Sequence, residues 1–432
     1  MITLTGCSRS SSDRKMHEER SHPKPLHLSA DYVQDKLRAY FKADSLKLEK
    51  LDIKPAILKK NNYSSLMTRI NVEYTTDESE DKQATKFMIK TNFAEKNPAA
   101  HVFIKYGIYT REMDMYQRIL SKIADLVKRE IQDPRRICAG TVYVDKDRDS
   151  IIFEDLALEH YKVACRIKKL DLAHTHLVLE RLANFHAAGA ALAERELGIF
   201  KNNYDRGFFN RHTRGYEPIM KSLLMTLSRS LNSDQELRQR YQAKIDRLVD
   251  RIMVYGERST TNNPGDFLTL NHGDLWTTNL MFQYDAKGQP INAVFIDFQF
   301  SVWNSPAIDL HYFFSTSIRD ELRLNNQTEL VQFYYYKLKD ALKKLKYAGC
   351  MPTLFDFQQQ FRTRAFYAAF ASLIFEPFMV YDGEEKVSLE HVISEGKGGI
   401  RFKDDVYQQE CVRQRLHHTL PYLDQWGLLD DI

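Results

Sequence analysis

Residues 268–300 read LTLNHGDLWTTNLMFQYDAKGQPINAVFIDFQF, and this stretch contains the pattern that decides the fold. A short apolar run leads into His272 and Asp274, and Asn279 follows five positions after the aspartate. A strand-like piece, a polar turn and a second apolar strand then end at Asp297. Two apolar strands around a turn that contains Asp, Gly and Pro indicate a β-hairpin. We expect this hairpin to bring Asp274, Asn279 and Asp297 together.

Three oxygen-bearing side chains in this arrangement suit the transfer of a phosphoryl group. The reaction needs a carboxylate beside the attacking hydroxyl, and hard oxygen ligands for the Mg²⁺ that bridges the phosphates of ATP. Asp274 fits the first need as the catalytic residue, and Asn279 and Asp297 fit the second as metal ligands. An H-x-D tripeptide alone is common and usually has no catalytic role. The joint order of H-x-D-x-x-x-x-N, a turn, and an apolar strand ending in I-D-F is that of the catalytic and metal-binding loops of the protein-kinase fold.

Three segments then resemble a known family. HGDLWTTN at 272–279, VFIDFQ at 294–299 and PAIDL at 306–310 resemble the ecdysteroid kinase-like family, whose relatives include choline kinases and aminoglycoside phosphotransferases. The tryptophan after HGDL, and D-F-Q where protein kinases have D-F-G, favour this family over the protein kinases. The resemblance covers roughly residues 45–400. It implies ATP and Mg²⁺ as cofactors, and an α+β, two-lobed protein-kinase-like fold with a small antiparallel β-sheet N-lobe and a mainly helical C-lobe.

The residue pattern and the resemblance together predict three parts of the chain. Residues 1–27 are rich in Ser, Arg, Lys, His and Glu and lack apolar periodicity, which is typical of a disordered tail. We expect a nucleotide-binding N-lobe at 28–155. A C-lobe at 156–432 should contain the catalytic loop and the acceptor site.

A strand at 86–90 is a candidate element of the nucleotide site. Its alternating pattern places Phe87 and Ile89 on one face. Met88 and Lys90 share the opposite face, where Met88 would contact the adenine and Lys90 the α- and β-phosphates. A lysine at a strand end is usually only solvated, so this assignment depends on a partner for Lys90.

The helix expected near Thr110 supplies that partner. Tyr116 belongs to its buried stripe, and Glu112 lies at the border of the stripe in the family pattern E-x-x-x-Y. We therefore expect Glu112 to pair with Lys90. Asp114 is the less favoured alternative.

A polar turn between the two strands that precede residue 75 is a candidate phosphate loop. Backbone N–H groups and the side chains of Asn62, Ser64 and Ser65 could hold phosphate oxygens there. The sequence departs from the family here, because relatives carry a glycine before N-Y-x-S, whereas this chain has Lys59 and Lys60. An ordinary β-turn is an equally good interpretation of this segment alone.

The segment that connects the lobes is predicted at Glu154–Asp155–Leu156. It follows an expected hairpin at 142–153 and resembles the E-D-L hinge of these kinases. Backbone groups near Glu154 and Leu156 would bind the adenine edge. Position is therefore a better guide to function here than side-chain identity.

Three further residues have predicted supporting roles. We interpret His186, in an A-x-F-H-A element, as a hydrogen-bonded core histidine and not as a catalyst. Asp309 should accept hydrogen bonds from the backbone of the catalytic loop, although an acidic residue that favours the helix dipole is the alternative. A helix at 233–255 should have Ser233 as its N-cap, with Glu236 three positions later.

Composition limits the class of protein. The 432 residues, 43% of them hydrophobic, are enough for a soluble two-lobed enzyme. The 62 basic and 58 acidic residues are too balanced to indicate a nucleic-acid partner. The five cysteines are scattered and indicate thiols of a reducing compartment, not a disulfide or zinc framework. No run approaches the roughly 20 apolar residues of a membrane span, so we expect no membrane insertion and a cytoplasmic location.

The sequence thus favours an ATP- and Mg²⁺-dependent kinase that phosphorylates a hydroxyl of a small lipophilic alcohol, with an ecdysteroid as the acceptor that the resemblance suggests. The dense aromatic content of residues 361–378 would suit such an acceptor. A phosphotransferase of choline or aminoglycoside type is one alternative. A non-catalytic ligand-binding protein on a kinase scaffold is another, because the turn at 59–65 lacks glycine. A hydrolase built on His272 and Asp274 lacks further clustered ligands.

Overall fold

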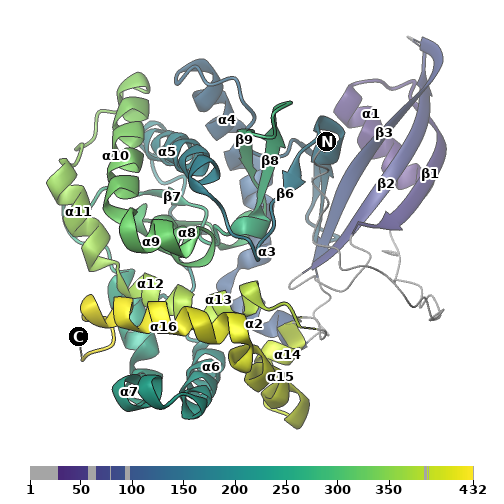
Figure 1. Ribbon diagram of the computed structural model, residues 1–432. Coiled ribbons are helices and arrows are strands. Elements are labelled where there is room, and N and C mark those ends of the chain that lie inside the picture. Colours follow the sequence, from purple (N-terminus) through teal and green to yellow (C-terminus); the bar gives the residue numbers. More distant parts are fainter. Residues whose placement is uncertain are drawn as a thin grey trace.

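The computed structural model describes residues 28–56, 65–77, 79–92, 98–383, 387 and 389–431. Five antiparallel strands form a twisted sheet in the order β1-β2-β3-β5-β4, at the right of Figure 1. Their bounds are β1 Lys47–Pro55, β2 Ser65–Thr76, β3 Ser79–Asn92, β4 Thr141–Asp145 and β5 Ser150–Glu154. The central strand β3 pairs with both β2 and β5, so its residues are held from two sides.

Helix α1 (Ala30–Phe41) packs on one face of this sheet. Its apolar side chains form a buried cluster with Phe87 and Ile89 of β3. Met88 instead packs against the main core on the opposite face. The alternation predicted for β3 is therefore confirmed, and it directs Lys90 toward the rest of the molecule, away from α1.

The chain leaves β3 through a helical stretch that reaches the other part of the molecule. It comprises α2 Pro98–Tyr106, α3 Ile108–Asp114, a π-helical turn Met115–Ile119 and α4 Leu120–Arg129. Tyr116 is buried, as the helical pattern predicted, and Met113, Leu120 and Ile123 are buried with it. Helix α2 contacts α14, so this stretch joins the sheet to the helical part (Figure 1).

The remaining chain is mainly helical. Its helices are α5 Leu172–Arg195, α6 Glu217–Ser230, α7 Gln235–Ser259, α8 Ala307–Thr316, α9 Asp320–Asn325, α10 Gln327–Lys344, α11 Leu354–Thr363, α12 Phe366–Phe370, α13 Glu376–Val380, α14 Leu389–Ile393, α15 Lys397–Gln408 and α16 Glu410–Gln425. A π-helical turn at Ala371–Phe375 joins α12 to α13. Short 3₁₀ turns occur at Leu156–Glu159, Leu231–Ser233, Thr277–Asn279 and Phe298–Phe300.

Two small sheets lie among these helices and carry the segment quoted above. One contains β6 Lys162–Val163, β8 Leu280–Tyr284 and β9 Pro290–Phe295, and the other pairs β7 Thr269–Asn271 with β10 Val302–Asn304. Strands β8 and β9 form the predicted antiparallel hairpin, in which Leu280 pairs with Phe295. The α+β fold class with a small antiparallel sheet and a mainly helical second part is confirmed.

One helix start differs from the prediction. Asp234, not Ser233, caps α7, because its extended backbone lets its side chain accept from the N–H of Leu237 at 3.0 Å. Ser233 belongs to the preceding 3₁₀ turn, where its hydroxyl donates to the carbonyl of Ser230. The sequence offered two adjacent capping residues, and the end of α6 decided between them.

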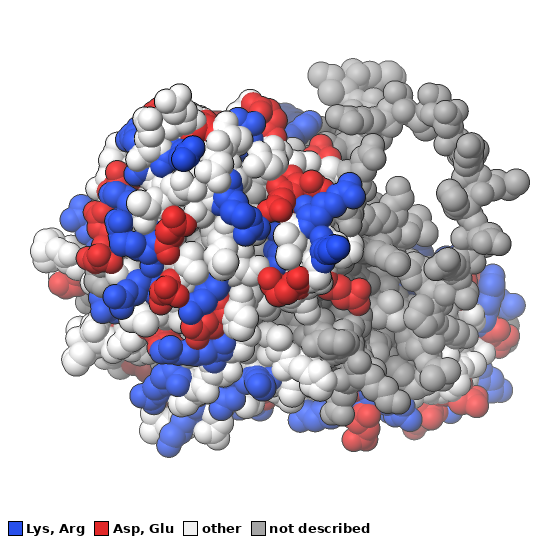
Figure 2. All heavy atoms as spheres, turned by 90° about the horizontal axis from the view of Figure 1, so that it is seen from below, with Lys and Arg blue, Asp and Glu red and all other residues white. Residues whose placement is uncertain are grey.

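Basic and acidic side chains are interspersed over the described face shown in Figure 2. Among the described residues, no helix combines the length and the apolar character that crossing a membrane requires.

Candidate active site

Asp309 fixes the backbone of the loop that contains Asp274. It lies in the first turn of α8, and its carboxylate accepts from the backbone N–H of His272 at 2.7 Å and of Gly273 at 2.8 Å. The predicted contact of Asp309 with this loop is confirmed. His186 Nε2 lies 3.1 Å from the same carboxylate, and its Nδ1 lies 2.6 Å from the hydroxyl of Tyr334. His186 is therefore a hydrogen-bonded core histidine, as expected.

His272 links the loop to the end of the hairpin. Its Nε2 donates to the carbonyl of Ile296 at 2.9 Å, and its Nδ1 accepts from the backbone N–H of Asp274 at 3.3 Å. Complete burial lowers its pKa, which favours the neutral imidazole. Because both ring nitrogens are occupied, His272 positions the loop and leaves proton transfer to another group.

Gly273 is required by the shape of the loop. Its φ is 82°, a left-handed conformation that side chains disfavour. A Cβ at this position would lie 2.0 Å from the carbonyl oxygen of Phe300. The close passage of residues 273 and 300 therefore depends on the absence of a side chain.

Asp274 is nine-tenths buried and is held through both carboxylate oxygens. Oδ1 accepts from the hydroxyl of Tyr312 at 2.7 Å, and Oδ2 accepts from Nδ2 of Asn279 at 3.1 Å. Burial raises the pKa of Asp274 to about 7, and the charge of Asp297 adds to this effect while the two hydrogen bonds oppose it. A carboxylate that titrates near neutral pH suits general-base chemistry.

The Asn279 side chain faces the same point. Its Nδ2 also donates to the backbone carbonyl of Asp274 at 2.8 Å. Since Nδ2 is engaged in this way, Oδ1 is the atom of the amide that could bind a cation. The backbone carbonyl of Asn279 accepts from the N–H of Ile296, which places it beside Asp297 across the hairpin.

Lys90 joins the sheet to the loop that follows β9. Its Nζ lies 2.7 Å from Glu112 Oε2 and 2.8 Å from Asp297 Oδ1. Burial would lower the pKa of Lys90, but the charges of Asp297 and Glu112 outweigh burial and raise it. The pairing of Lys90 with Glu112 is thus present, whereas Asp114 bonds to Arg118 instead.

Asp297 has an uncommon backbone. It directly precedes the 3₁₀ turn Phe298–Phe300 and has a φ of 67°, a left-handed conformation that is uncommon outside glycine. Such conformations cost about 1–3 kcal/mol and persist where the surroundings impose them. The ion pair with Lys90 and the end of β9 are the local features that hold Asp297 in place.

The oxygen atoms available here fit Mg²⁺. Asn279 Oδ1 and the Asp297 carboxylate are hard ligands of the kind that Mg²⁺ binds together with water and phosphate oxygens. Among the described residues, no group of three or more His, Cys, Asp or Glu side chains could hold a metal ion by itself. A cation bound by these two residues would take its remaining ligands from the phosphates of a nucleotide and from water.

The other predicted nucleotide residues lie at several places. Met88 is half-buried opposite Phe153 in the sheet, and Leu156 is buried just after β5. Ser65 is buried at the start of β2. Asn62 and Ser64 lie outside the described residues.

Glu154 has structural contacts at the predicted hinge. Its side chain accepts from the hydroxyl of Tyr40 at 2.6 Å and pairs with Arg136. Its backbone N–H donates to the carbonyl of Gly140 at 3.0 Å. These contacts fix the strand end at the predicted hinge.

Two residues near the site were not singled out from the sequence. Tyr312 contacts Asp274, and its position one helical turn after Asp309 was the available signal, because residues three apart share a helix face. Arg111 is buried beside Glu112 and donates to three backbone carbonyls, at 2.6 Å to Asn203, 2.7 Å to Tyr106 and 3.0 Å to Gln299. An arginine next to Glu112 gave no comparable signal, because two of its three acceptors, the carbonyls of Asn203 and Gln299, are distant in sequence.

The role of Gly273 gives a first prediction. Replacement by alanine should lower the free energy of unfolding by more than the roughly 1–2 kcal/mol of a left-handed alanine, because the new Cβ must also displace the Phe300 carbonyl. Gly198 is the matched control, since its φ is 80° and a Cβ added there would meet no atom within 4 Å. Urea unfolding of G273A and G198A measures the difference. Equal losses in the two variants would contradict the close-approach argument.

Comparison with known proteins identifies the family. The family model described as the ecdysteroid kinase-like family matches residues 59–347, more than half of the chain. The structure is similar to that of an ethanolamine kinase from Plasmodium vivax, with a TM-score of 0.34 and 14% identity, over 76% of this chain and 83% of that chain. No protein of curated function matches significantly in sequence. The family match confirms the resemblance seen in the catalytic-loop motifs: the chain belongs to the ecdysteroid kinase-like family.

Proposed function

We propose that the protein uses ATP and Mg²⁺ to phosphorylate a hydroxyl of a small lipophilic alcohol, with an ecdysteroid as the first acceptor to test. Family membership supports a small-molecule kinase in general terms. The observation that carries the proposal is the contact of Lys90 with both Glu112 and Asp297. This contact brings the Lys90 ammonium of the sheet next to Asp297, the proposed metal ligand at the end of the hairpin, and both lie near the buried carboxylate of Asp274.

Each side chain then has a role in the transfer. Bound Mg²⁺-ATP supplies the phosphoryl group and the positive charge that stabilises it during transfer. Asn279 Oδ1 and Asp297 would hold the metal, and Lys90 would hold the phosphates that precede the transferred one. As the acceptor oxygen bonds to the γ-phosphorus and the bond to the bridging oxygen of ADP breaks, Asp274 takes the hydroxyl proton.

The nucleotide would lie along β3 and the hinge. We propose that Met88 contacts the adenine and that backbone groups between Glu154 and Leu156 bind its edge. Ser65, with Asn62 and Ser64, would hold phosphate oxygens. Glu112 would keep Lys90 aligned, because a buried ammonium needs a carboxylate that stays in place when the phosphates arrive.

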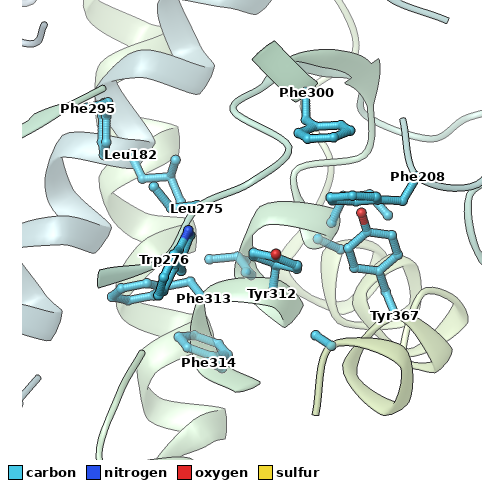
Figure 3. Packing of buried hydrophobic residues seen from close by; sticks show 14 of the residues in the cluster. Leu182, Phe208, Leu275, Trp276, Phe295, Phe300, Tyr312, Phe313, Phe314 and Tyr367 are labelled. Atoms are coloured by element: carbon cyan, nitrogen blue, oxygen red, sulfur yellow. The ribbon is translucent and has the colours of Figure 1, made fainter. Parts of the chain in front are cut away.

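Aromatic packing next to Asp274 supports a lipophilic acceptor. The rings of Phe208, Phe375 and Tyr367 surround Tyr312, with centroids 6.2, 6.1 and 6.2 Å from its ring. Figure 3 shows Tyr312 beside Phe208 and Tyr367. The rings of Phe208, Tyr312 and Tyr367 are themselves buried, so they place a layer of aromatic carbon behind Asp274, and such surroundings suit an apolar skeleton better than a highly polar sugar. This part of the proposal concerns the acceptor class and is separate from the transfer itself.

The role of Asp274 is open to a direct test. D274N should lower the turnover number by about 10²–10⁴-fold, the usual contribution of a general base, while ATP affinity stays near the wild-type value. The exposed Asp285, on the turn of the same hairpin, provides the matched control D285N. Coupled assay of ADP release and calorimetric titration of ATP measure the two quantities. A D274N variant with wild-type turnover would refute the assignment.

The acceptor class can be tested by mass spectrometry. Purified protein with ATP and Mg²⁺ should add the mass of one phosphate to an ecdysteroid, and not to choline, ethanolamine or an aminoglycoside. Product from an amino alcohol alone would instead support the choline-kinase type of acceptor. Metal-dependent nucleotide binding without product from any acceptor would favour a ligand-binding protein on a kinase scaffold.

A further inference from the structure

We propose that Tyr312 is a positioning residue, which sets the orientation of the Asp274 carboxylate for proton transfer. The inference rests on the proposed function. It assigns a second role to α8, the helix that already fixes the loop backbone through Asp309.

The hydrogen bond to Asp274 is the first observation. The Tyr312 hydroxyl donates to Oδ1 at 2.7 Å, and both side chains are at least nine-tenths buried. Asn279 holds the other oxygen at 3.1 Å and comes from the same loop. Among the described residues, Tyr312 therefore holds this carboxylate from outside the loop. With one donor on each oxygen, the orientation of the carboxylate is fixed.

The position of Tyr312 on α8 is the second observation. Tyr312 lies three residues after Asp309, which places both side chains on one face of the helix. Asp309 fixes the backbone N–H groups of His272 and Gly273, and Tyr312 fixes the next side chain, that of Asp274. Every residue of α8 is buried, so a single rigid element sets both the path of the loop and the direction of its carboxylate.

The surroundings of the tyrosine ring are the third observation. The ring packs against Phe208, Phe375 and Tyr367. Figure 3 shows the Tyr312 ring between Phe208 and Tyr367 on one side and Leu275 and Trp276 on the other. Tyr312, Phe208 and Tyr367 are all buried, so the ring has little room to move. This packing holds the Tyr312 hydroxyl against the Asp274 carboxylate.

A purely structural role makes a different prediction. If the ring only fills space, loss of the hydroxyl should leave catalysis intact, because phenylalanine keeps the same packing. If the hydroxyl orients the base, its loss should impair the chemical step and spare binding. The Michaelis constants and the turnover number therefore separate the two roles.

The decisive variant is Y312F, assayed with 20-hydroxyecdysone as acceptor. We expect the turnover number to fall by about 10–100-fold, part of the full contribution of a general base, with the Michaelis constants for acceptor and ATP within about twofold of wild type. Y335F is the matched control, because Tyr335 is equally buried and its hydroxyl donates to the carbonyl of Pro352 at 2.9 Å, outside the site. Y335F should keep wild-type turnover.

A second variant tests the role of the ring. Y312L removes the ring as well as the hydroxyl, so turnover should fall at least as far as in Y312F and the unfolding midpoint should also fall, while calorimetric ATP affinity stays unchanged. Wild-type turnover in Y312F would overturn the proposal. The proposal would also be overturned if the fall in turnover of Y312F came with comparable rises in both Michaelis constants and with a lower unfolding midpoint.

We expect a slow hydrolysis of ATP, in which water replaces the alcohol, and this reaction gives a readout that does not need the acceptor. Y312F should lower this rate by about the same factor as its turnover number, and an unchanged rate would overturn the positioning role. If wild-type protein hydrolyses ATP through Asp274 but does not phosphorylate 20-hydroxyecdysone, the acceptor assignment fails and the positioning role stands. If D274N hydrolyses ATP at the wild-type rate, the proposed function fails and the positioning role fails with it.

Discussion

A buried ammonium shared by two carboxylates is the interaction on which the site depends. Lys90 belongs to β3, Glu112 to α3, and Asp297 to the turn after β9, 207 residues away along the chain from the lysine. Removing a charge from water is costly, and the cost is offset only when the partners are close and well oriented. The Lys90–Glu112 pair is nearly inaccessible, so the sheet and the helical part must meet correctly for the lysine to be satisfied. The same geometry places the Lys90 ammonium beside the Asp297 carboxylate, the arrangement on which the proposed function depends.

The loop that contains Asp274 depends on a comparable rule for backbone groups. Buried N–H groups need acceptors. The N–H groups of His272 and Gly273 each donate to one oxygen of the Asp309 carboxylate. This carboxylate also contacts His186 of α5, which contacts Tyr334 of α10 in turn. This network of side chains from three helices fixes the backbone of the loop. Asp274 and Asn279 lie on the same loop and are not part of the network.

Arg111 extends this arrangement to the helix that contains Glu112. Its guanidinium binds carbonyls of Tyr106, Asn203 and Gln299, so it attaches α3 both to the helical part and to the segment just after Asp297. Burial lowers its pKa to about 10, but a guanidinium at that value is still charged at neutral pH. Glu112 and Asp297 are therefore held in fixed relation by their neighbours as well as by Lys90.

The sequence alone determined the chemical types and their local order: the H-x-D-x-x-x-x-N loop, the β8–β9 hairpin, the alternation that directs Lys90 away from α1, and the pairing of Lys90 with Glu112. These follow from short-range periodicity and from motif spacing, both of which are written in neighbouring residues. The tertiary structure alone decided that Tyr312 holds Asp274, that Arg111 binds the segment after Asp297, and that His186 shares the Asp309 carboxylate with the loop backbone. Such contacts join residues 38 to 188 positions apart. They arise because a folded chain must satisfy each buried polar group with whatever partner packing brings within reach, and no local pattern records that choice.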